Sequence, residues 1–453
     1  MPAHHVRTFG CNRLFSDSAI RLFRSSAVLI PLSGVLVACS AERGKSSASL
    51  EGGSAGMAST PDTGASARRD SGAQAAVVPS GTAVPSSDVP ASPASVNAAR
   101  AGEVAVANRT VGRIEVDKEF PIVRALYVNR FAAQSSKRMK QLIQIADETE
   151  INALVIDMKD EFGLNYVPSN KEFARNGGRA GIIKGLPAML DTLRAHHILP
   201  IARMVVFKDS VTAAVHPEWT IRRQDGTLWR DKKNNAWVNP YRHELWDYNI
   251  GVAEELVKMG FGEVQFDYIR FPEPYPSLPT QVFPNSKGEP KPDVLAAFLK
   301  DATGRIAKLG GRTTADIFGL VTTVRGPLEV GQEWEKISPN IDVVLPMVYP
   351  SHYPRGDLGL AVPNAQPYEV LKISLSKAKQ RDQKLGITKK EHVRPWLQAF
   401  TLGKPAYGPA ELEAQKKGTY EAGYDGWVLW NAGSKFEAFL PALEKGELVS
   451  HKK

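Results

Sequence analysis

Three aspartates stand inside or at the end of short apolar segments, namely Asp157, Asp267 and Asp316. A carboxylate is costly to bury unless it is paired or used in chemistry. Two such groups in one site can act as acid, base or nucleophile in a hydrolysis. We therefore take the three aspartates as candidate catalytic residues, and the burial argument is strongest for Asp267.

The segment 263–269 shows why Asp267 is expected to face inward. Side chains of a strand point alternately to its two faces. Val264, Phe266 and Tyr268 share one face, which suits packing against helices, while Gln265 and Asp267 share the other. The same alternation in the segment 153–158 predicts that Asp157 faces inward too.

Each of these polar residues has a structural alternative. Asp157 and Lys159 share a face, and they could form a buried ion pair without any role in chemistry. Arg203 could neutralise a carboxylate rather than contact substrate. Asp316 could be a strand-end residue that is bonded to backbone. Carboxylate pairs are common in structural networks as well as in active sites.

The elements that must position these residues alternate between strand and helix. Eight strand-like segments cover residues 122–128, 153–158, 199–206, 263–269, 313–320, 342–349, 393–399 and 426–430. Helical segments cover residues 135–149, 185–196, 243–259, 294–309, 368–381 and 409–422, and the weakest helix is expected around 327–337. This pattern predicts a (β/α)8 barrel, whose active site lies at the carboxyl ends of its strands. A doubly wound sheet is the alternative, but the phosphate-binding glycine turn expected after its first strand is absent from 129–131.

Two long loops fall at the predicted active-site face. The loop 207–241 contains Trp219, Trp229, Trp237 and Tyr241, and the loop 271–292 is rich in proline. Tryptophan rings could stack on sugars, or they could form a small core that holds the loop in place. We expect the structural role for Trp219 and ligand contact for Trp237 and for Trp430, which lies in the last strand. The full set of expected substrate contacts is Lys159, Arg203, Trp237, Asn239, Arg270, Tyr349, Gln398, Trp430 and Asn431.

Three segments carry a resemblance to a known family. They are Val-Arg-Ala-Leu-Tyr at 123–127, Ala-Leu-Val-Ile-Asp-Met-Lys-Asp at 153–160 and Phe-Asp-Tyr-Ile-Arg-Phe-Pro at 266–272. They resemble a family of bacterial glycoside hydrolases that began as a domain of unknown function, over residues 123–437. The resemblance implies a TIM barrel that acts on carbohydrate.

Analogy with barrel glycosidases implies roles for the aspartates. Asp267, on the fourth strand, would be the nucleophile or base, and Asp316 would be the acid, with Asp157 as the substitute. Carboxyl groups about 5–5.5 Å apart give retention, and groups about 6.5–9.5 Å apart give inversion. Neighbouring strands are about 4.8 Å apart, so either separation is within reach.

The first residues resemble a lipoprotein export signal. Arginines precede an apolar stretch at 27–38, which ends in Leu-Val-Ala-Cys39. We expect residues 1–39 to be the signal, with lipid on Cys39, although an ordinary secretory signal or a short uncleaved anchor would also fit. Residues 40–118, poor in large apolar side chains, are expected to be a disordered, flexible linker, and residues 119–447 the barrel. This predicts a lipid-anchored protein of the cell envelope, at the outer membrane or the periplasmic face if the host has two membranes.

Other chemistries find less support in the sequence. The predicted barrel contains no Gly-x-Ser-x-Gly elbow, no His-Glu-x-x-His and no phosphate-binding glycine loop, so we expect no cofactor and no metal. The net charge of +9 is scattered, which argues against a nucleic-acid partner. Converging carboxylates with an aromatic rim favour a glycosidase that acts on an envelope or extracellular polysaccharide. A catalytically inactive glycan-binding barrel and a metal-dependent hydrolase or deacetylase are the alternatives.

Overall fold

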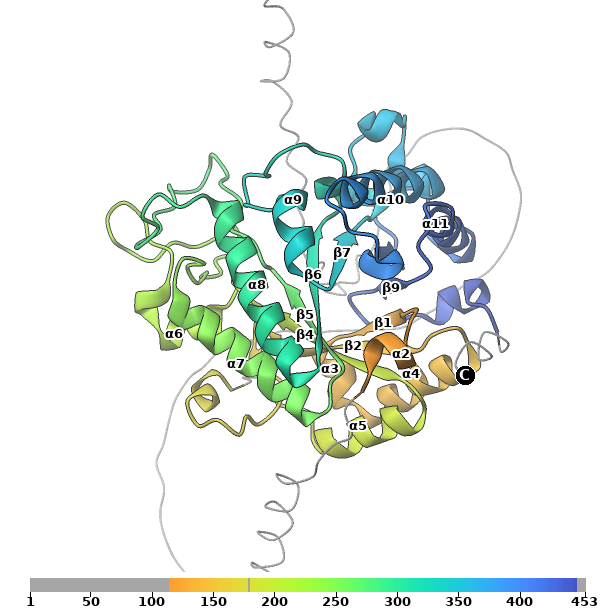
Figure 1. Cartoon of the computed structure of the whole chain (residues 1–453), viewed down its shortest axis with the longest axis horizontal. Coiled ribbons are helices and arrows are strands. Elements are labelled where there is room, and N and C mark those ends of the chain that lie inside the picture. Colours follow the sequence, from red (N-terminus) through yellow and green to blue (C-terminus); the bar gives the residue numbers. More distant parts are fainter. Residues whose placement is uncertain (1–113, 178–179, 446–453) are drawn as a thin grey trace, which may run out of the picture. The chain divides into compact units, whose positions relative to one another are not determined.

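Parallel strands form a closed ring in the computed structural model, which describes residues 114–177 and 180–445 (Figure 1). The eight strands of the ring are β1 (Arg124–Val128), β2 (Ala153–Asp160), β4 (Leu199–Val205), β5 (Glu263–Asp267), β6 (Arg312–Phe318), β7 (Val343–Met347), β8 (Trp396–Gln398) and β9 (Trp427–Trp430). Neighbours along the chain pair in parallel, and β9 pairs with β1 to close the ring. The short β3 (Gly163–Leu164) adds an antiparallel hairpin to β2. The predicted (β/α)8 barrel is confirmed.

Helices surround the ring. They are α2 (Val116–Glu119), α3 (Arg130–Gln134), α4 (Ser136–Glu148), α5 (Leu186–Ala195), α6 (Ser210–Val215), α7 (His243–Met259), α8 (Lys291–Leu309), α9 (Trp334–Ile337), α10 (Pro367–Lys384) and α11 (Pro409–Glu421). The helix expected to be weakest is the four-residue α9. It is held in place by Trp334, which is fully buried and donates its indole N–H to Asp382 of α10 at 2.8 Å.

Local signals fix the ends of the long helices. Ser135 caps α4 by accepting a hydrogen bond from the backbone N–H of Arg138 at 3.2 Å. Helices α7 and α8 both end at a glycine in the left-handed region, Gly260 at φ 116° and Gly310 at φ 79°. A side chain at these positions would be strained, so glycine sets where each helix stops and the chain turns into the next strand.

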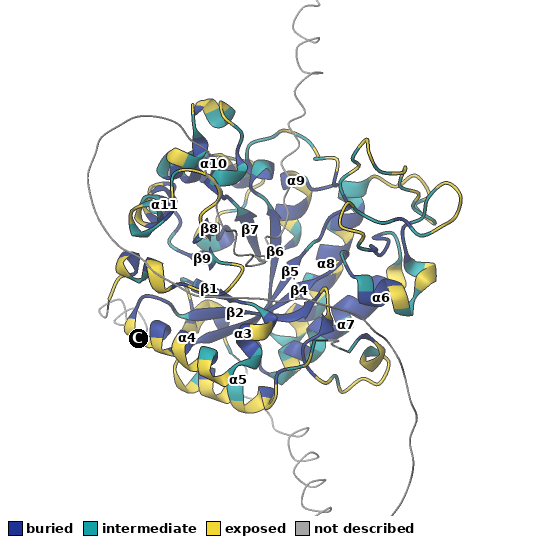
Figure 2. Cartoon of the chain, turned by 180° about the vertical axis from the view of Figure 1, so that it is seen from behind, coloured by how far each residue is buried: buried dark blue, intermediate teal, exposed yellow. Residues whose placement is uncertain are grey.

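Alternation along the strands divides the apolar residues into two cores. The strands of the ring are coloured as buried in Figure 2. The outer faces pack against the helices, as where Phe266 of β5 meets Phe298 of α8 with ring centroids 5.6 Å apart. The inner faces fill the barrel with small and branched residues, such as Ala125, Val155 and Ile201. The expected orientation of segment 263–269 is confirmed, because Gln265 and Asp267 contact other inward-facing polar groups.

The amino-terminal end of the ring is closed by charge pairs. Glu263 is fully buried and pairs with Arg312 and Arg394. Burial alone would raise the pKa of Glu263, but the two guanidinium charges outweigh it and lower the pKa to about 2. Asp117 of α2 accepts a hydrogen bond from Arg312 at 2.7 Å, and Val116 is only 5% exposed. The expected domain boundary at residue 119 therefore falls inside the packed domain, which includes α2.

The expected export signal, Cys39 and most of the expected linker lie outside the residues that the structure describes. No helix within the described ranges is both long and apolar enough to cross a membrane.

Candidate active site

The three aspartates and Arg203 lie on four consecutive strands of the ring. The pairing of β2 with β4 sets Asp157 opposite Arg203. The pairing of β5 with β6 sets Phe266 opposite Ala315, so that the next residues, Asp267 and Asp316, are neighbours across the sheet. Asp267 is the last residue of β5, at the carboxyl end where barrel active sites form. The structure thus brings the three predicted catalytic residues into one cluster.

Arg203 is the centre of this cluster. Its Nη1 donates to Asp157 at 2.5 Å, and its Nε donates to Oδ2 of Asp267 at 3.1 Å. Its Nη2 also pairs with Asp267. The guanidinium lies 5.4 Å from the ring of Tyr127 and 5.6 Å from that of Trp430. Arg203 is only 5% exposed, so its first role is to hold two carboxylates, one of the two possibilities left open by the sequence.

Asp316 occupies the most enclosed position of the three. The Trp396 indole donates to its Oδ1 at 2.7 Å, and Gln265 Nε2 lies 3.0 and 2.9 Å from its two oxygens. Burial raises the pKa of Asp316 well above its ordinary value, and the nearby charge of Asp267 raises it further. Asp316 therefore holds a proton where an ordinary aspartate would have lost it. Its partners are side chains, so the alternative of a strand-end residue bonded to backbone does not apply.

Asp157 accepts a hydrogen bond from the hydroxyl of Tyr127 at 2.6 Å. Burial raises the pKa of Asp157 to about 6, against the opposing charge of Arg203. The rings of Tyr127 and Trp430 lie 4.1 Å apart, and Trp430 is half-buried at the mouth. Tyr127 thereby connects the Asp157 carboxyl to Trp430 at the mouth of the barrel.

Burial is the main cause of the two raised pKa values, and it acts in a cluster with more acidic than basic groups. Asp157, Asp267 and Asp316 could carry three negative charges, whereas Arg203 supplies one positive charge. A net negative charge in a buried site is relieved when one or more carboxyls keep a proton. The cluster can therefore offer a carboxylic acid and a carboxylate side by side, which are the two groups that hydrolysis of a glycosidic bond uses.

Lys159 does not pair with Asp157. The register of β2 against β4 shifts between the two residues. The Lys159 ammonium instead lies 2.6 Å from Oδ2 of Asp209, the residue that caps α6. The ion pair with Asp157, an alternative that the sequence left open, is not formed. The Lys159 ammonium is bonded to Asp209 and to the backbone carbonyl of Val205, so its expected contact with substrate finds no support in the structure.

The tryptophans of loop 207–241 hold the loops together. Trp237 is 1% exposed and donates its indole N–H to Asp231 at 3.0 Å, while Trp229 is fully buried and donates to the backbone of Pro279 at 2.8 Å. Trp219 stacks on His216 at 3.8 Å, in keeping with its expected structural role. The structure contradicts the expectation that Trp237 offers a ring to the ligand.

The remaining expected contacts serve the loops as well. Asn239 donates to the backbone of Pro284 at 2.7 Å, and Arg270 pairs with Glu273 at 3.1 Å. Both residues are buried. Gln398 is fully buried and accepts a hydrogen bond from the Ser351 hydroxyl at 2.8 Å. These contacts fix the backbone around the mouth and leave little of the three side chains for a ligand.

Asn431 and Tyr349 complete the set of expected contacts. Asn431 is half-buried and donates to the backbone of Ala399 at 2.7 Å, so it ties the loop after β9 to the end of β8. Tyr349 is buried in the inner core that also contains Trp396, the indole donor to Asp316, and burial and the charge of Asp316 raise the pKa of Tyr349.

Two residues of the cluster escaped the sequence analysis, namely Tyr127 and Trp396. Alternation along the strands could have identified both as inward-facing. Tyr127 follows the inward-facing Ala125 by two positions, and Trp396 precedes the inward-facing Gln398 by two. Among the residues that the structure describes, no group of three or more His, Cys, Asp or Glu side chains is placed to hold a metal ion.

The closed parallel barrel carries its carboxyl cluster toward the carboxyl ends of the strands, the face on which enzymes of this fold build their active sites. The chain belongs to the DUF4015 family, described as "Putative glycosyl hydrolase domain", whose model matches residues 125–436. The family therefore implies a carbohydrate substrate.

A solved structure shows the same fold. The PgaB (BpsB) glycoside hydrolase domain from Bordetella bronchiseptica is 16% identical, with a TM-score of 0.52, over 72% of this chain and 99% of that one. A hypothetical protein from Ruminiclostridium thermocellum is 32% identical over 42% of this chain and 96% of that one, with a TM-score of 0.38. Among curated proteins no match is found.

Proposed function

We propose that the barrel hydrolyses glycosidic bonds of a polysaccharide, with Asp267 as nucleophile or base and Asp316 as acid. One observation carries the proposal: Asp316, whose pKa is raised by burial, lies on the strand next to Asp267, which is paired with Arg203. A protonated carboxyl beside a carboxylate is the arrangement that this reaction needs.

The chemistry assigns one step to each group. The proton of Asp316 moves to the glycosidic oxygen as the bond to the anomeric carbon breaks. Asp267 either attacks that carbon or removes a proton from the water that does so. If a glycosyl–Asp267 ester forms, the Asp316 carboxylate takes a proton from the incoming water, the water oxygen bonds to the sugar, and both carboxyl groups regain their starting states.

Asp157 is the alternative acid, because its pKa is also raised and because it shares Arg203 with Asp267. Leaving groups separate the two candidates. A phenol with a low pKa can leave as its anion without being protonated, whereas a sugar hydroxyl has a high pKa and leaves only when an acid protonates it. The true acid is therefore the residue whose asparagine variant still releases activated phenols from aryl glycosides but fails on polysaccharide.

The experiment that tests the proposal is turnover of a polysaccharide and aryl-glycoside panel by the purified chain and its Asp267→Asn variant. Turnover that the variant loses while it remains folded supports the proposal. Glycan binding without turnover would favour an inactive binding barrel instead. Turnover that a chelator removes and a divalent ion restores would favour a metal-dependent hydrolase or deacetylase.

We also propose that the chain is exported and anchored in the cell envelope through lipid on Cys39, so that the substrate is an envelope or extracellular polysaccharide. The Leu-Val-Ala-Cys39 string after a basic and apolar stretch supports this. Labelled fatty acid should enter the chain in a two-membrane bacterial host, and Cys39→Ser should abolish the label. Equal labelling of parent and variant would remove this proposal and leave the hydrolase proposal intact.

A further inference from the structure

Exposed aromatic side chains gather at the mouth of the barrel. Phe131 is 58% exposed in α3, directly after β1, and Phe162 is 37% exposed in the turn after β2. Their ring centroids lie 6.0 Å apart. Single exposed apolar residues are ordinary on protein surfaces, but an exposed aromatic pair at the face that carries the carboxyl cluster points to a ligand with an apolar surface.

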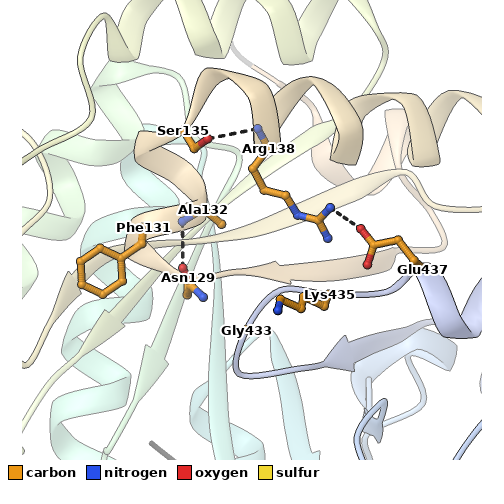
Figure 3. Close-up of a pocket in the computed structure, with 8 residues that line it drawn as sticks. All are labelled: Asn129, Phe131, Ala132, Ser135, Arg138, Gly433, Lys435 and Glu437. Carbon is orange, nitrogen blue, oxygen red and sulfur yellow. Dashed lines mark hydrogen bonds and ion pairs between the residues drawn. The ribbon is translucent and has the colours of Figure 1, made fainter. Parts of the chain in front are cut away.

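A groove of about 470 Å³ lies beside Phe131, between the loops that follow β1 and β9. Figure 3 shows Asn129 at its centre, with Phe131 on one side and the loop of Gly433 and Lys435 on the other. This volume falls within the range of about 300–1,000 Å³ that is typical of small-ligand pockets. The groove is large enough for a sugar unit.

The base of the groove is held firmly. The Asn129 backbone N–H donates to the Ser434 hydroxyl at 2.8 Å, and its side chain donates to the Ala432 carbonyl at 2.9 Å. Arg138 donates to the Ser434 carbonyl at 3.1 Å and pairs with Glu437. These polar groups are already bonded to one another, so they shape the groove rather than wait for a ligand.

Two side chains of the groove remain available to a ligand. Phe131 offers the face of its ring, and Lys435 is exposed, with no side-chain hydrogen bond or ion pair to any residue in the described part of the chain. A pyranose has an apolar face of C–H groups and an edge of hydroxyl oxygens. The ring suits the first and the ammonium group suits the second.

The groove continues the active-site mouth. Tyr127 of β1 and Trp430 of β9 contact each other at 4.1 Å, and both lie within 6 Å of the Arg203 guanidinium, at 5.4 and 5.6 Å. Asn129 and Gly433 follow Tyr127 and Trp430 by two and three residues along the chain. A glycan chain that extends from the carboxyl cluster past Trp430 would therefore reach the groove next.

We propose that this groove is a remote subsite, in which Phe131 stacks on a pyranose unit of the polysaccharide some distance from the bond that is cleaved. The inference rests on the proposed glycosidase function and deepens it. It requires a chain substrate long enough to span the mouth, so a single sugar with an aryl leaving group would not reach Phe131.

The test compares Phe131→Ala, Phe131→Trp and Leu385→Ala with the parent, all as the full chain. Leu385 is a matched control, because it is 36% exposed but follows α10, at the opposite end of the barrel. Retardation in gels that contain each polysaccharide of the panel measures binding. KM and kcat for polysaccharide and for aryl glycoside measure turnover, and thermal unfolding checks the fold.

We expect Phe131→Ala to weaken retardation and to raise KM for polysaccharide by roughly three- to tenfold, a change typical for the loss of one aromatic contact. The kcat for polysaccharide and both constants for aryl glycoside should stay at the parental values. Phe131→Trp should restore parental binding, and Leu385→Ala should change nothing.

The outcomes separate this inference from the proposed function. Parental turnover with unchanged polysaccharide KM in Phe131→Ala overturns the subsite alone. Retardation that depends on Phe131, without turnover in the parent, overturns the glycosidase and supports the groove as a glycan site. A parent that neither binds nor cleaves any polysaccharide of the panel overturns both.

Discussion

Arg203 is the residue on which the candidate site depends most. It is buried between Asp157 and Asp267, which approach it from two strands. A buried ion pair contributes little net stability relative to apolar residues, but removal of one partner leaves a buried charge without compensation. The site therefore needs this guanidinium whatever else it does in catalysis.

Replacement of Arg203 by methionine should lower the free energy of unfolding by about 3–5 kcal/mol at pH 7, because two carboxyls lose their shared partner. Urea denaturation measures the change. Arg305→Met provides a control, since Arg305 pairs with Asp247 and Glu254 at the surface and should cost less than about 1 kcal/mol. Similar losses in both variants would contradict the central position of Arg203.

The raised pKa of Asp157 gives the stability of the protein a pH dependence. In the unfolded chain this group titrates near its ordinary value of 3.8, and in the folded chain near 6. The folded state holds the proton more tightly, so this contribution to stability is complete below pH 3.8 and is lost as the pH rises through 6.

The free energy of unfolding of the parent relative to Asp157→Asn should therefore fall between pH 4 and pH 7, by an amount on the order of 1–3 kcal/mol. Asparagine keeps the shape of the side chain and does not titrate. Parallel urea titrations at several pH values measure the difference. A difference that is constant with pH would show that folding does not raise the pKa of Asp157.

At the scale of elements, the strands were more predictable than the loops. All eight barrel strands could be located from the sequence, because alternation and strand length are local properties. The same alternation placed Asp267 and Gln265 inside the barrel. The register shift after Asp157 could not be read from the sequence, because alternation assumes an unbroken ladder, and Lys159 therefore has a different partner from the expected one.

The loop tryptophans show a second limit. Whether Trp237 faces a ligand or the protein depends on Asp231 and on the packing of the two long loops against each other. A sequence shows that an aromatic residue lies at the mouth, but such contacts decide whether its ring is exposed. For the same reason the exposure of Phe131 could not be predicted, since nothing in the composition of its short helix shows that the ring faces solvent.

Trp237→Ala and Trp430→Ala should therefore behave differently. Trp237→Ala empties a buried site and should cost about 3–5 kcal/mol of stability. Trp430→Ala removes a half-buried ring at the mouth, so it should cost less stability and raise KM for glycan. Chemical denaturation and kinetics on the same preparations measure both effects. A larger loss of stability in Trp430→Ala than in Trp237→Ala would reverse these roles.

At the scale of the whole molecule, the closed ring brings together the first and last strands of the domain that the family model matches, residues 125–436. Strand β9 completes the ring by pairing with β1, and α2 packs at the amino-terminal end of the strands through Val116 and Asp117. The part of the chain needed for stability therefore begins before the first strand. The sequence pattern predicts this boundary a few residues late, because α2 is short and its apolar contacts are not local.

A chain that starts at residue 121 should be less stable than one that starts at residue 114. The shorter chain loses the buried side chains of Val116 and Phe120, which are 5% and 8% exposed. Each should contribute about 1.5–3 kcal/mol. Thermal and urea unfolding of the two chains measure the loss, and equal stability would show that α2 is dispensable.

If Asp267 and Asp316 work as a pair at this mouth, the loss of activity in each variant should depend on the leaving group of the substrate. Turnover of polysaccharide and of aryl glycosides with good and poor leaving groups would be compared for the parent, Asp267→Asn and Asp316→Asn, each checked for folding. We expect Asp267→Asn to lose about 100- to 10,000-fold in turnover of every substrate, and Asp316→Asn to lose as much on polysaccharide but to retain release of activated phenols. Parental turnover in either variant would contradict the paired roles of the two aspartates.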